Sequence, residues 1–158
     1  MTNPPWQQPE WITQTQIILD SFAKLLNRDL IDRSGSEEEQ SQRLFEAPFV
    51  VVSHNTAEDP ILNYGNETAL RLWEADLETL TAMPSRKTAE LVHRDERAEL
   101  LRRVTENGFI DDYQGIRISA TGKRFQIDQA IVWNLFDQEG HPAGQAATFS
   151  EWEMLPEL

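Results

Sequence analysis

The side chains that could carry chemistry in this chain include a Ser-His pair and two adjacent aspartates. Ser53 and His54 are neighbours in an apolar run, and alternation along a strand would point them to opposite faces, which argues against a nucleophile–base pair. Asp111 and Asp112 alternate in the same way, so they do not make the facing carboxylates of a glycosidase. These neighbouring residues therefore predict no catalytic site.

Metal and cofactor chemistry is also weakly represented. The chain has no cysteine, which excludes disulfides, thiolate zinc sites and cysteine nucleophiles. Its three histidines, His54, His93 and His141, are scattered and have no zinc-binding spacing. His93, directly before a predicted helix, is the candidate haem ligand, but a lone histidine lacks the supporting signals of a haem site. We expect no metal and no haem, and the residues identify no other cofactor.

Composition limits the partners. The 158 residues carry a net charge of −13, and the tightest basic groups, such as Arg102-Arg103 and Lys123-Arg124, are brief. Because Lys and Arg supply most of the affinity for phosphates, nucleic acid and anionic membranes are not expected partners. The chain contains neither a run of about 20 apolar residues nor a secretory signal. These features predict a cytoplasmic protein.

The elements that must position any site begin with an N-terminal helix. Residues 1–9 contain three prolines and are expected to form a flexible arm. Residues 10–46 are expected to form a helix followed by an acidic linker, whose run SGSEEEQSQ is either a loop or a weak polar helix. The helix has one apolar stripe, which predicts a contact with its own sheet or with a partner. We predict a dimer interface at Trp11, Ile18, Phe22 and Leu25.

The main part of the chain alternates strands and helices. The run FVVVSH predicts a buried strand, and residues 61–64 predict a second strand before a Gly65-Asn66 corner. A helix is expected from Asn66 to residue 74, with Trp73 on its inner face. Short helical turns over residues 77–91 and a longer helix over 93–107 follow. Three further strands are predicted over residues 109–119, 124–136 and 143–149.

Long segments of this chain resemble the MEKHLA domain family, a group related to PAS domains. The resemblance rests on QIILDSFAKLLNRDLI, APFVVVSHNTAEDPILNYGNETALRLWE, GFIDDYQGIRISATGKRF and VWNLFDQEGHPAGQAATFS. The family includes small stand-alone bacterial proteins, which this chain resembles, and C-terminal parts of plant homeodomain–leucine-zipper proteins. The resemblance implies an α+β fold with a five-stranded antiparallel sheet and helices on one face, over residues 47–153, with a tail at 154–158.

The resemblance also implies a place for a ligand, because PAS-like domains hold small molecules between sheet and helices. Gln129 is singled out as a polar side chain on an otherwise apolar strand face, where it could orient a ligand or satisfy a neighbouring strand. Flavin–cysteine adduct chemistry is excluded because the chain has no cysteine, whereas non-covalent flavin binding stays open. The expected pocket residues are Trp73, Leu101, Phe125, Ile127, Gln129 and Ile131.

Two functions from different classes remain. The first is a non-enzymatic sensory or protein-interaction module that self-associates or binds a protein partner and takes up a small apolar ligand. The alternative is a small α+β cone enzyme, an isomerase or hydrolase, with Asp128 as its pocket carboxylate. Strand alternation puts Asp128 on the face opposite Phe125 and Ile127, which favours the first function.

Overall fold

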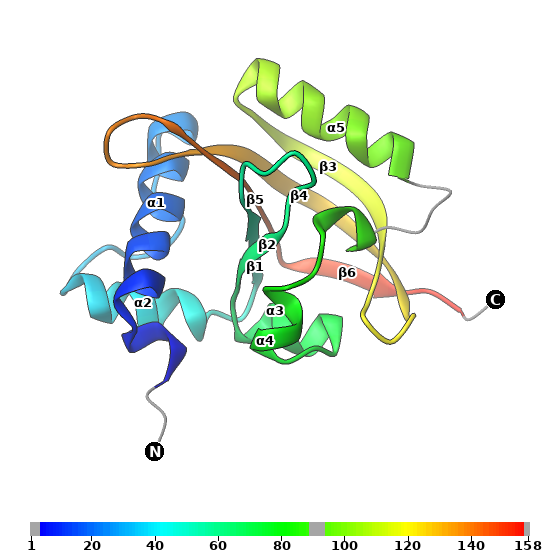
Figure 1. The fold of residues 1–158 in the computed structure, drawn as a ribbon, viewed down its shortest axis with the longest axis horizontal. Helices are drawn as coiled ribbons and strands as arrows, with labels where there is room; N and C mark the ends of the chain where they lie inside the picture. Colours follow the sequence, from blue (N-terminus) through cyan, green and yellow to red (C-terminus); the bar gives the residue numbers. More distant parts are fainter. Residues whose placement is uncertain (1–3, 89–93, 157–158) are drawn as a thin grey trace.

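The structure, a computed structural model, describes residues 4–88 and 94–156. Its centre is a curved antiparallel sheet with the strand order β2-β1-β5-β4-β3 (Figure 1). A further strand, β6 (Glu151–Met154), pairs with β4. The five central strands are β1 (Val50–His54), β2 (Leu62–Gly65), β3 (Phe109–Ile118), β4 (Arg124–Phe136) and β5 (Pro142–Phe149). The predicted α+β fold with five ordered antiparallel strands is confirmed, with β6 as an addition.

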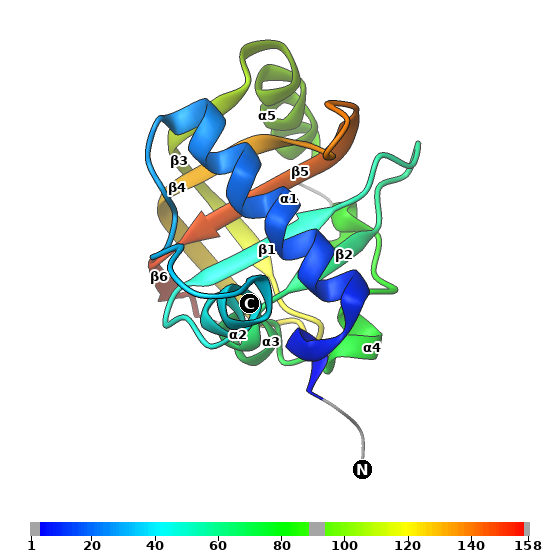
Figure 2. The ribbon, with the colours of Figure 1, turned by 90° about the vertical axis from the view of Figure 1, so that its left-hand side faces the viewer.

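Helices cover both faces of the sheet. The predicted amphipathic helix is α1 (Pro9–Leu26), which crosses one face diagonally (Figure 2). The opposite face carries α3 (Glu67–Trp73), α4 (Leu77–Leu80), the 3-10 helix η2 (Ser85–Thr88) and α5 (Arg94–Asn107). Neighbouring residues of β5 mark the two sides, because Ala146 packs in the α1 cluster and Ala147 packs against the α5 cluster. The expectation of helices on one face therefore holds for α3 to α5, and α1 covers the other.

The structure specifies two elements of the N-terminal part. Residues 5–7, expected in a flexible arm, form a 3-10 helix, η1 (Pro5–Gln7). Of the two alternatives for the acidic linker, the structure has the helix, α2 (Glu37–Phe45). It begins with a capping box: the Ser36 hydroxyl accepts from Glu39 N at 3.1 Å and the Glu39 carboxylate accepts from Ser36 N at 3.1 Å. The run of three glutamates is its exposed first turn, while Leu44 and Phe45 at its end are buried with α1.

The central strand β4 contains a bulge. Gln129 has a φ of 51°, and the partners of β4 on β3 change from Gly115 opposite Ile127 to Tyr113 opposite Ala130. The same point divides the pairing on the other edge, where residues 131–136 pair with β5 and residues 125–128 pair with β6. One extra residue reverses the alternation of side chains. Odd-numbered residues before the bulge and even-numbered residues after it therefore lie on the same face of the sheet.

The corner before α3 fixes how that helix enters. Asn66 begins α3 as predicted, and its carboxamide oxygen accepts from Ala69 N at 3.1 Å. Gly65 lies under Leu80 of α4 so closely that a Cβ atom at position 65 would overlap the Leu80 side chain. The corner therefore brings α3 and α4 directly onto the sheet, with Trp73 at the end of α3.

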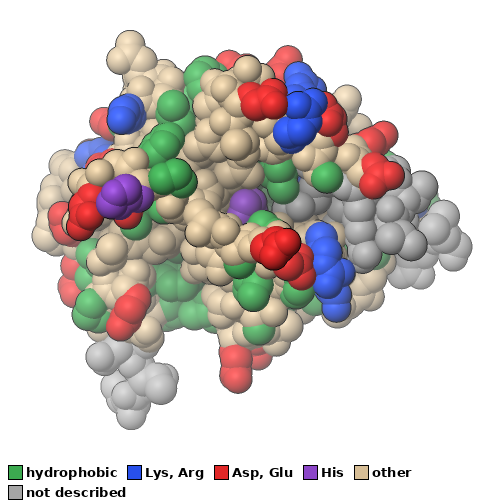
Figure 3. Space-filling view, turned by 45° about the horizontal axis from the view of Figure 1, so that its top comes forward, with side chains coloured by type: hydrophobic (Ala, Val, Ile, Leu, Met, Phe, Trp, Pro, Cys, Tyr) green, Lys and Arg blue, Asp and Glu red, His purple; other side chains and the backbone are tan. Residues whose placement is uncertain are grey.

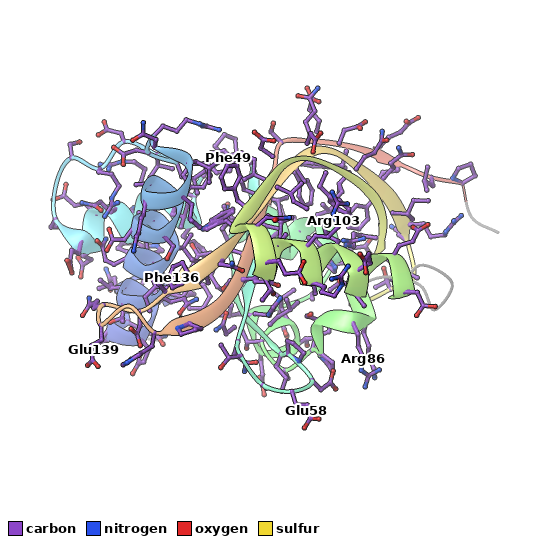
Figure 4. The ribbon with its side chains drawn as sticks, turned by 90° about the horizontal axis from the view of Figure 1, so that it is seen from above. Phe49, Glu58, Arg86, Arg103, Phe136 and Glu139 are labelled. Atoms are coloured by element: carbon purple, nitrogen blue, oxygen red, sulfur yellow. The ribbon has the colours of Figure 1, made fainter. Side chains whose placement is uncertain are left out.

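The surface carries charges of both signs. Arg102 pairs with Glu99 and Glu106 along α5, and Arg86 pairs with Asp59 at 3.2 Å. Figure 3 shows acidic and basic side chains beside one another on one face, with small groups of hydrophobic side chains between them. Arg86 and Glu58 project outward from one side of the molecule in Figure 4. No helix among the described residues is both long enough and apolar enough to span a bilayer.

Candidate functional site

A small cavity lies between the sheet and the helices α3, η2 and α5. Its volume is about 60 Å³. Residues from β1, β3, β4 and β5 form its floor, and Trp73, Thr88, Leu100 and Leu101 line it from the helices. Most of the wall is apolar, including Val52, Leu62, Ile127, Val132 and Phe149. A mainly apolar cavity with a few polar groups has the character of a small-molecule site.

Three of the predicted pocket residues line this cavity. They are Trp73, Leu101 and Ile127. Phe125 is fully buried one step behind the wall, where its ring packs edge-to-face on Trp73 with centroids 5.2 Å apart. Phe125 therefore supports the cavity without being among its lining residues.

Gln129 and Ile131 lie elsewhere, because the bulge changes the alternation of β4. Gln129 is the bulged residue, is exposed, and is not a polar group on an apolar inner face. Ile131 packs against the α1 cluster on the opposite side of the sheet. Ala130 and Val132 take the inner positions instead. The sequence-based assignment of one continuous face from Phe125 to Ile131 was therefore wrong beyond Ile127.

The inner polar amide belongs to Gln145 on β5, which is 7% exposed and lines the cavity. Its Nε2 group lies 3.1 Å from Leu101 O, 3.0 Å from Thr105 Oγ1 and 3.0 Å from Asn134 Oδ1. These contacts tie β5 to α5 and to β4. In the sequence, Gln145 is a polar residue within an apolar strand run. Strand alternation alone does not say whether such a residue lies on the inner or the outer face.

Trp73 is held firmly in the cavity wall. Its carbonyl accepts from Ala120 N at 3.0 Å in the β3–β4 turn. The next residue, Glu74, forms an ion pair with Lys123 at 2.8 Å, and the hydrogen bonds from Lys123 and Thr121 lower the pKa of the Glu74 carboxyl. The indole is 2% exposed, and its Nε1–H has no hydrogen-bond acceptor among the described residues. A residue of the wall therefore contains a buried donor whose hydrogen bond is not made by the described residues.

Arg117 on β3 also lines the cavity and was missed by the sequence analysis. Its side chain is buried, and its guanidinium donates to Ile116 O and to the Tyr113 hydroxyl, each at 2.9 Å. The guanidinium lies 5.2 Å from the centroid of the Tyr113 ring. The available signal was the spacing Tyr113-x-Gly115-x-Arg117, which puts the three residues on one strand face.

Ser53 and His54 point to opposite faces, as their alternation predicts. The Ser53 hydroxyl accepts a hydrogen bond from Gln14 Nε2 of α1 at 3.1 Å and donates one to Asn63 Oδ1 at 2.6 Å. His54 is 8% exposed and lines the cavity, with its Nδ1 3.0 Å from Asn55 O. The two side chains therefore do not form a nucleophile–base pair.

The remaining chemical candidates do not converge on the cavity. Within residues 4–88 and 94–156, no group of three or more His, Asp or Glu side chains is arranged to hold a metal. The haem candidate His93 lies outside the described residues. Asp128 is not among the cavity-lining residues; its carboxylate accepts from Gln114 Nε2 at 2.5 Å on the surface.

The predicted dimer residues pack against other residues of the same chain. Ile18 and Phe22 are fully buried, and Trp11 is 9% exposed. Trp11 stacks on Tyr64 with centroids 4.6 Å apart, and Phe22 packs edge-to-face on Trp133 at 5.0 Å. Leu25 packs against the same cluster. The apolar stripe of α1 therefore docks on its own sheet, and these side chains are not a free intermolecular surface in this conformation.

Burial also affects a tyrosine on the α1 side. Tyr64 is fully buried under Trp11, and this burial strongly raises the pKa of its hydroxyl. The tyrosine is therefore neutral, and it serves as packing for α1.

The profile of the MEKHLA domain matches residues 12–154, a range that begins within α1 and ends with β6. Among curated proteins, the chain is similar to the homeobox-leucine zipper protein REVOLUTA of Arabidopsis thaliana. The two are 24% identical over 130 residues, which is 81% of this chain and 15% of REVOLUTA. The chain thus spans a small part of the length of this relative.

Solved structures support the fold. A PAS domain of a protein from Colwellia psychrerythraea superposes with a TM-score of 0.63 at 9% identity, over 75% of this chain and 95% of that domain. A PAS domain from a two-component sensor histidine kinase superposes with a TM-score of 0.56 at 14% identity, over 72% of this chain and 91% of that domain. At these identities the likeness establishes a PAS-like fold and nothing about ligands.

Proposed function

Because the chain belongs to the MEKHLA domain family and has a PAS-like fold, we propose that it is a non-enzymatic sensory or protein-interaction module that binds a small ligand. The observation that carries the proposal is the mainly apolar cavity between the sheet and α3, η2 and α5. A ligand there would contact elements from both ends of the domain, since Trp73 and Leu101 belong to different helices. Its binding would favour one packing of α5 on the sheet and so change the surface offered to a partner.

The position of Asp128 favours a binding module over the alternative cone enzyme. A catalytic carboxylate must reach the substrate. Asp128 instead accepts a hydrogen bond from Gln114 and is not among the residues that line the cavity. We therefore propose no catalytic residue in the cavity. The polar groups there, Arg117, Gln145 and the Trp73 indole, are suited to binding and orienting a ligand.

Self-association is the second part of the proposal, with α1 as the exchanged element. The helix supplies much of the core on one face of the sheet, and Asn27 ends it in a left-handed conformation with a φ of 58°. If α1 of one copy covered the sheet of a second copy, the contacts of Phe22 and Ile18 would be preserved while two chains were joined. This exchange reconciles the predicted dimer residues with their burial.

The proposal places the protein in the cytoplasm, with a protein partner and no nucleic acid. The net charge of −13 and the absence of cysteine support this choice. The homeobox and zipper named for REVOLUTA belong to that protein; the region matched here is 15% of its length.

Native mass spectrometry of the purified full chain tests both parts together. We expect species at multiples of 18.2 kDa, with a small retained molecule that dissociates on collisional activation. Ala147→Leu fills the cavity and should remove the retained mass. Arg71→Gln, on the exposed side of α3, is the matched control and should keep it.

Different outcomes separate the two parts. A bare monomer that gains no mass when incubated with cell extract metabolites, for the wild type and both variants, would contradict ligand binding. A monomer that does retain a ligand would contradict self-association alone. Circular dichroism of Ala147→Leu should match the wild type, because overpacking by a few methyl groups costs only about 1–3 kcal/mol.

A further inference from the structure

Arg117 is a buried cation whose charge has no anionic partner among the described residues. The side chain is 8% exposed, and no described carboxylate forms an ion pair with it. A guanidinium has five N–H donors. Two donors are used, by Ile116 O and by the Tyr113 hydroxyl, and both acceptors are neutral. The positive charge itself is therefore not compensated by any described part of the chain.

Such an arrangement is unfavourable unless an anion joins it. Removing a charge from water has a large desolvation cost, and buried charges in proteins are normally paired. Arg117 is in the wall of the cavity, where an anion could reach it. The same wall contains a second unused donor, the Trp73 indole N–H, in a side chain that is 2% exposed. The residues that line the cavity thus include unused donors and a positive charge.

The strand around Arg117 holds the guanidinium in place. Tyr113, Gly115 and Arg117 share one face of β3, and the Tyr113 ring lies across Gly115. A Cβ atom at position 115 would overlap the Tyr113 hydroxyl, so glycine allows this close approach. The Tyr113 ring and hydroxyl then fix the Arg117 fork, which lowers the entropic cost of binding an anion.

We propose that the cavity binds a short-chain monocarboxylate, with its carboxylate on Arg117 and its carbon chain against the apolar wall. The planar guanidinium matches a carboxylate through paired hydrogen bonds. The apolar walls of Val52, Leu62 and Phe149 suit a hydrocarbon tail and disfavour phosphate, which is polar on all sides. The proposal rests on the ligand-binding function proposed above and specifies its ligand class.

The cavity volume sets the length of the ligand. One water needs roughly 10–15 Å³ of such space. A cavity of about 60 Å³ therefore accepts roughly four to six non-hydrogen atoms. Acetate, propionate and butyrate fall in this range, whereas a larger cofactor exceeds it.

The test is a titration of the ¹⁵N-labelled full chain, followed by NMR at the Trp73 indole resonance, which Trp73→Phe identifies. The ligands are sodium acetate, propionate and butyrate, compared with propionamide, inorganic phosphate and sodium chloride at equal ionic strength. We expect a saturable shift with at least one carboxylate. Propionamide has the shape of propionate without its charge, so it should bind about tenfold more weakly or worse.

Variants connect the binding to Arg117. Arg117→Gln should weaken carboxylate binding by roughly tenfold to a hundredfold. Arg71→Gln removes the same charge from an exposed site and should leave binding unchanged. Tyr113→Phe keeps the ring but loses the hydroxyl that holds the fork, so it should weaken binding less. Tyr113→Phe also provides a second measurement if Arg117→Gln does not fold.

Three results would overturn the inference. Equal binding of propionamide and propionate, unaffected by Arg117→Gln or Tyr113→Phe, would assign a neutral ligand and leave the proposed function intact. Tighter binding of phosphate than of any carboxylate would assign a different anion class. If no ligand shifts the Trp73 resonance, the assignment of a carboxylate ligand is wrong. Retained mass in the native spectra would then show that the cavity takes another ligand.

Discussion

Asn66 joins three elements through one buried side chain. Its carboxamide oxygen accepts from Val51 N and Ala69 N, each at 3.1 Å. Its amide nitrogen donates to Leu44 O at 3.1 Å and to Phe49 O at 2.8 Å. The residue is therefore a helix cap for α3 and a clamp between the end of α2, the strand β1 and the corner of the chain. Both roles position Trp73 in the cavity wall.

Asn66→Ala should lower the free energy of unfolding by about 2–4 kcal/mol, because it removes a helix cap and leaves buried carbonyls without donors. Asp76→Ala is the matched control, since Asp76 caps α4 at the surface with one bond, from Thr79 N at 2.8 Å. That control should cost about 0.5–1 kcal/mol. Urea denaturation measures both, and equal losses would show that Asn66 acts as a cap alone.

Among the elements, β4 decides which residues meet in the site. Its bulge at Gln129 puts Phe125 and Ile127 on the same face as Ala130 and Val132, and turns Trp133 toward α1. Each half of the strand has its own partner, β6 or β5. The bulge therefore lets one strand serve the cavity and the α1 core at once, and it lies in the left-handed region that suits glycine.

Substitutions at Gln129 test the bulge. Gln129→Gly should stabilise the protein by up to about 1 kcal/mol, because a left-handed residue with a side chain costs about 1–2 kcal/mol. Gln129→Val should destabilise it, since a β-branched side chain tolerates a positive φ poorly. Urea denaturation gives both signs. If valine were as stable as glutamine, the residue would be in ordinary extended conformation and the two halves of β4 would share one parity.

For the whole molecule, the balance of charges depends on pH. The backbone N–H of His141 lowers the pKa of Asp137, and the backbone N–H of Ser36 lowers that of Glu39. A lowered pKa in the folded state adds stability that is present above the ordinary values of 3.8 and 4.5 and is lost as the pH falls below them. The net charge of −13 acts in the opposite direction, because protonation of side chains as the pH falls relieves their repulsion.

We therefore expect stability to change little or rise slightly from pH 7 to about 5 and to fall between about 5 and 3. Urea midpoints at fixed ionic strength measure this profile. Glu39→Gln keeps the capping acceptor of α2 without a titrating group, so its decline should be shallower. A continuous rise to about pH 3 would mean that charge repulsion outweighs the hydrogen-bonded carboxylates.

The local sequence determined the elements of this protein well. The stripe of Ile18 and Phe22 predicts α1, and the Asn66 corner predicts the start of α3, because helix periodicity and capping are properties of neighbouring residues. The long segments quoted for the family resemblance gave the PAS-like fold. Three members of the cavity, Trp73, Leu101 and Ile127, follow from those elements.

Only the tertiary structure decided how these faces combine. The alternation in the run FQIDQAIVW does not decide which residues face the cavity. The pairing of β4 with β5 and β6 selects the bulge that exposes Gln129. The partner of α1 was open between its own sheet and a second chain, since an apolar stripe does not specify what covers it. The proposed role of Arg117 as an anion-binding residue also depends on the tertiary structure. Its burial and the lack of a described carboxylate partner are set by residues distant in the chain.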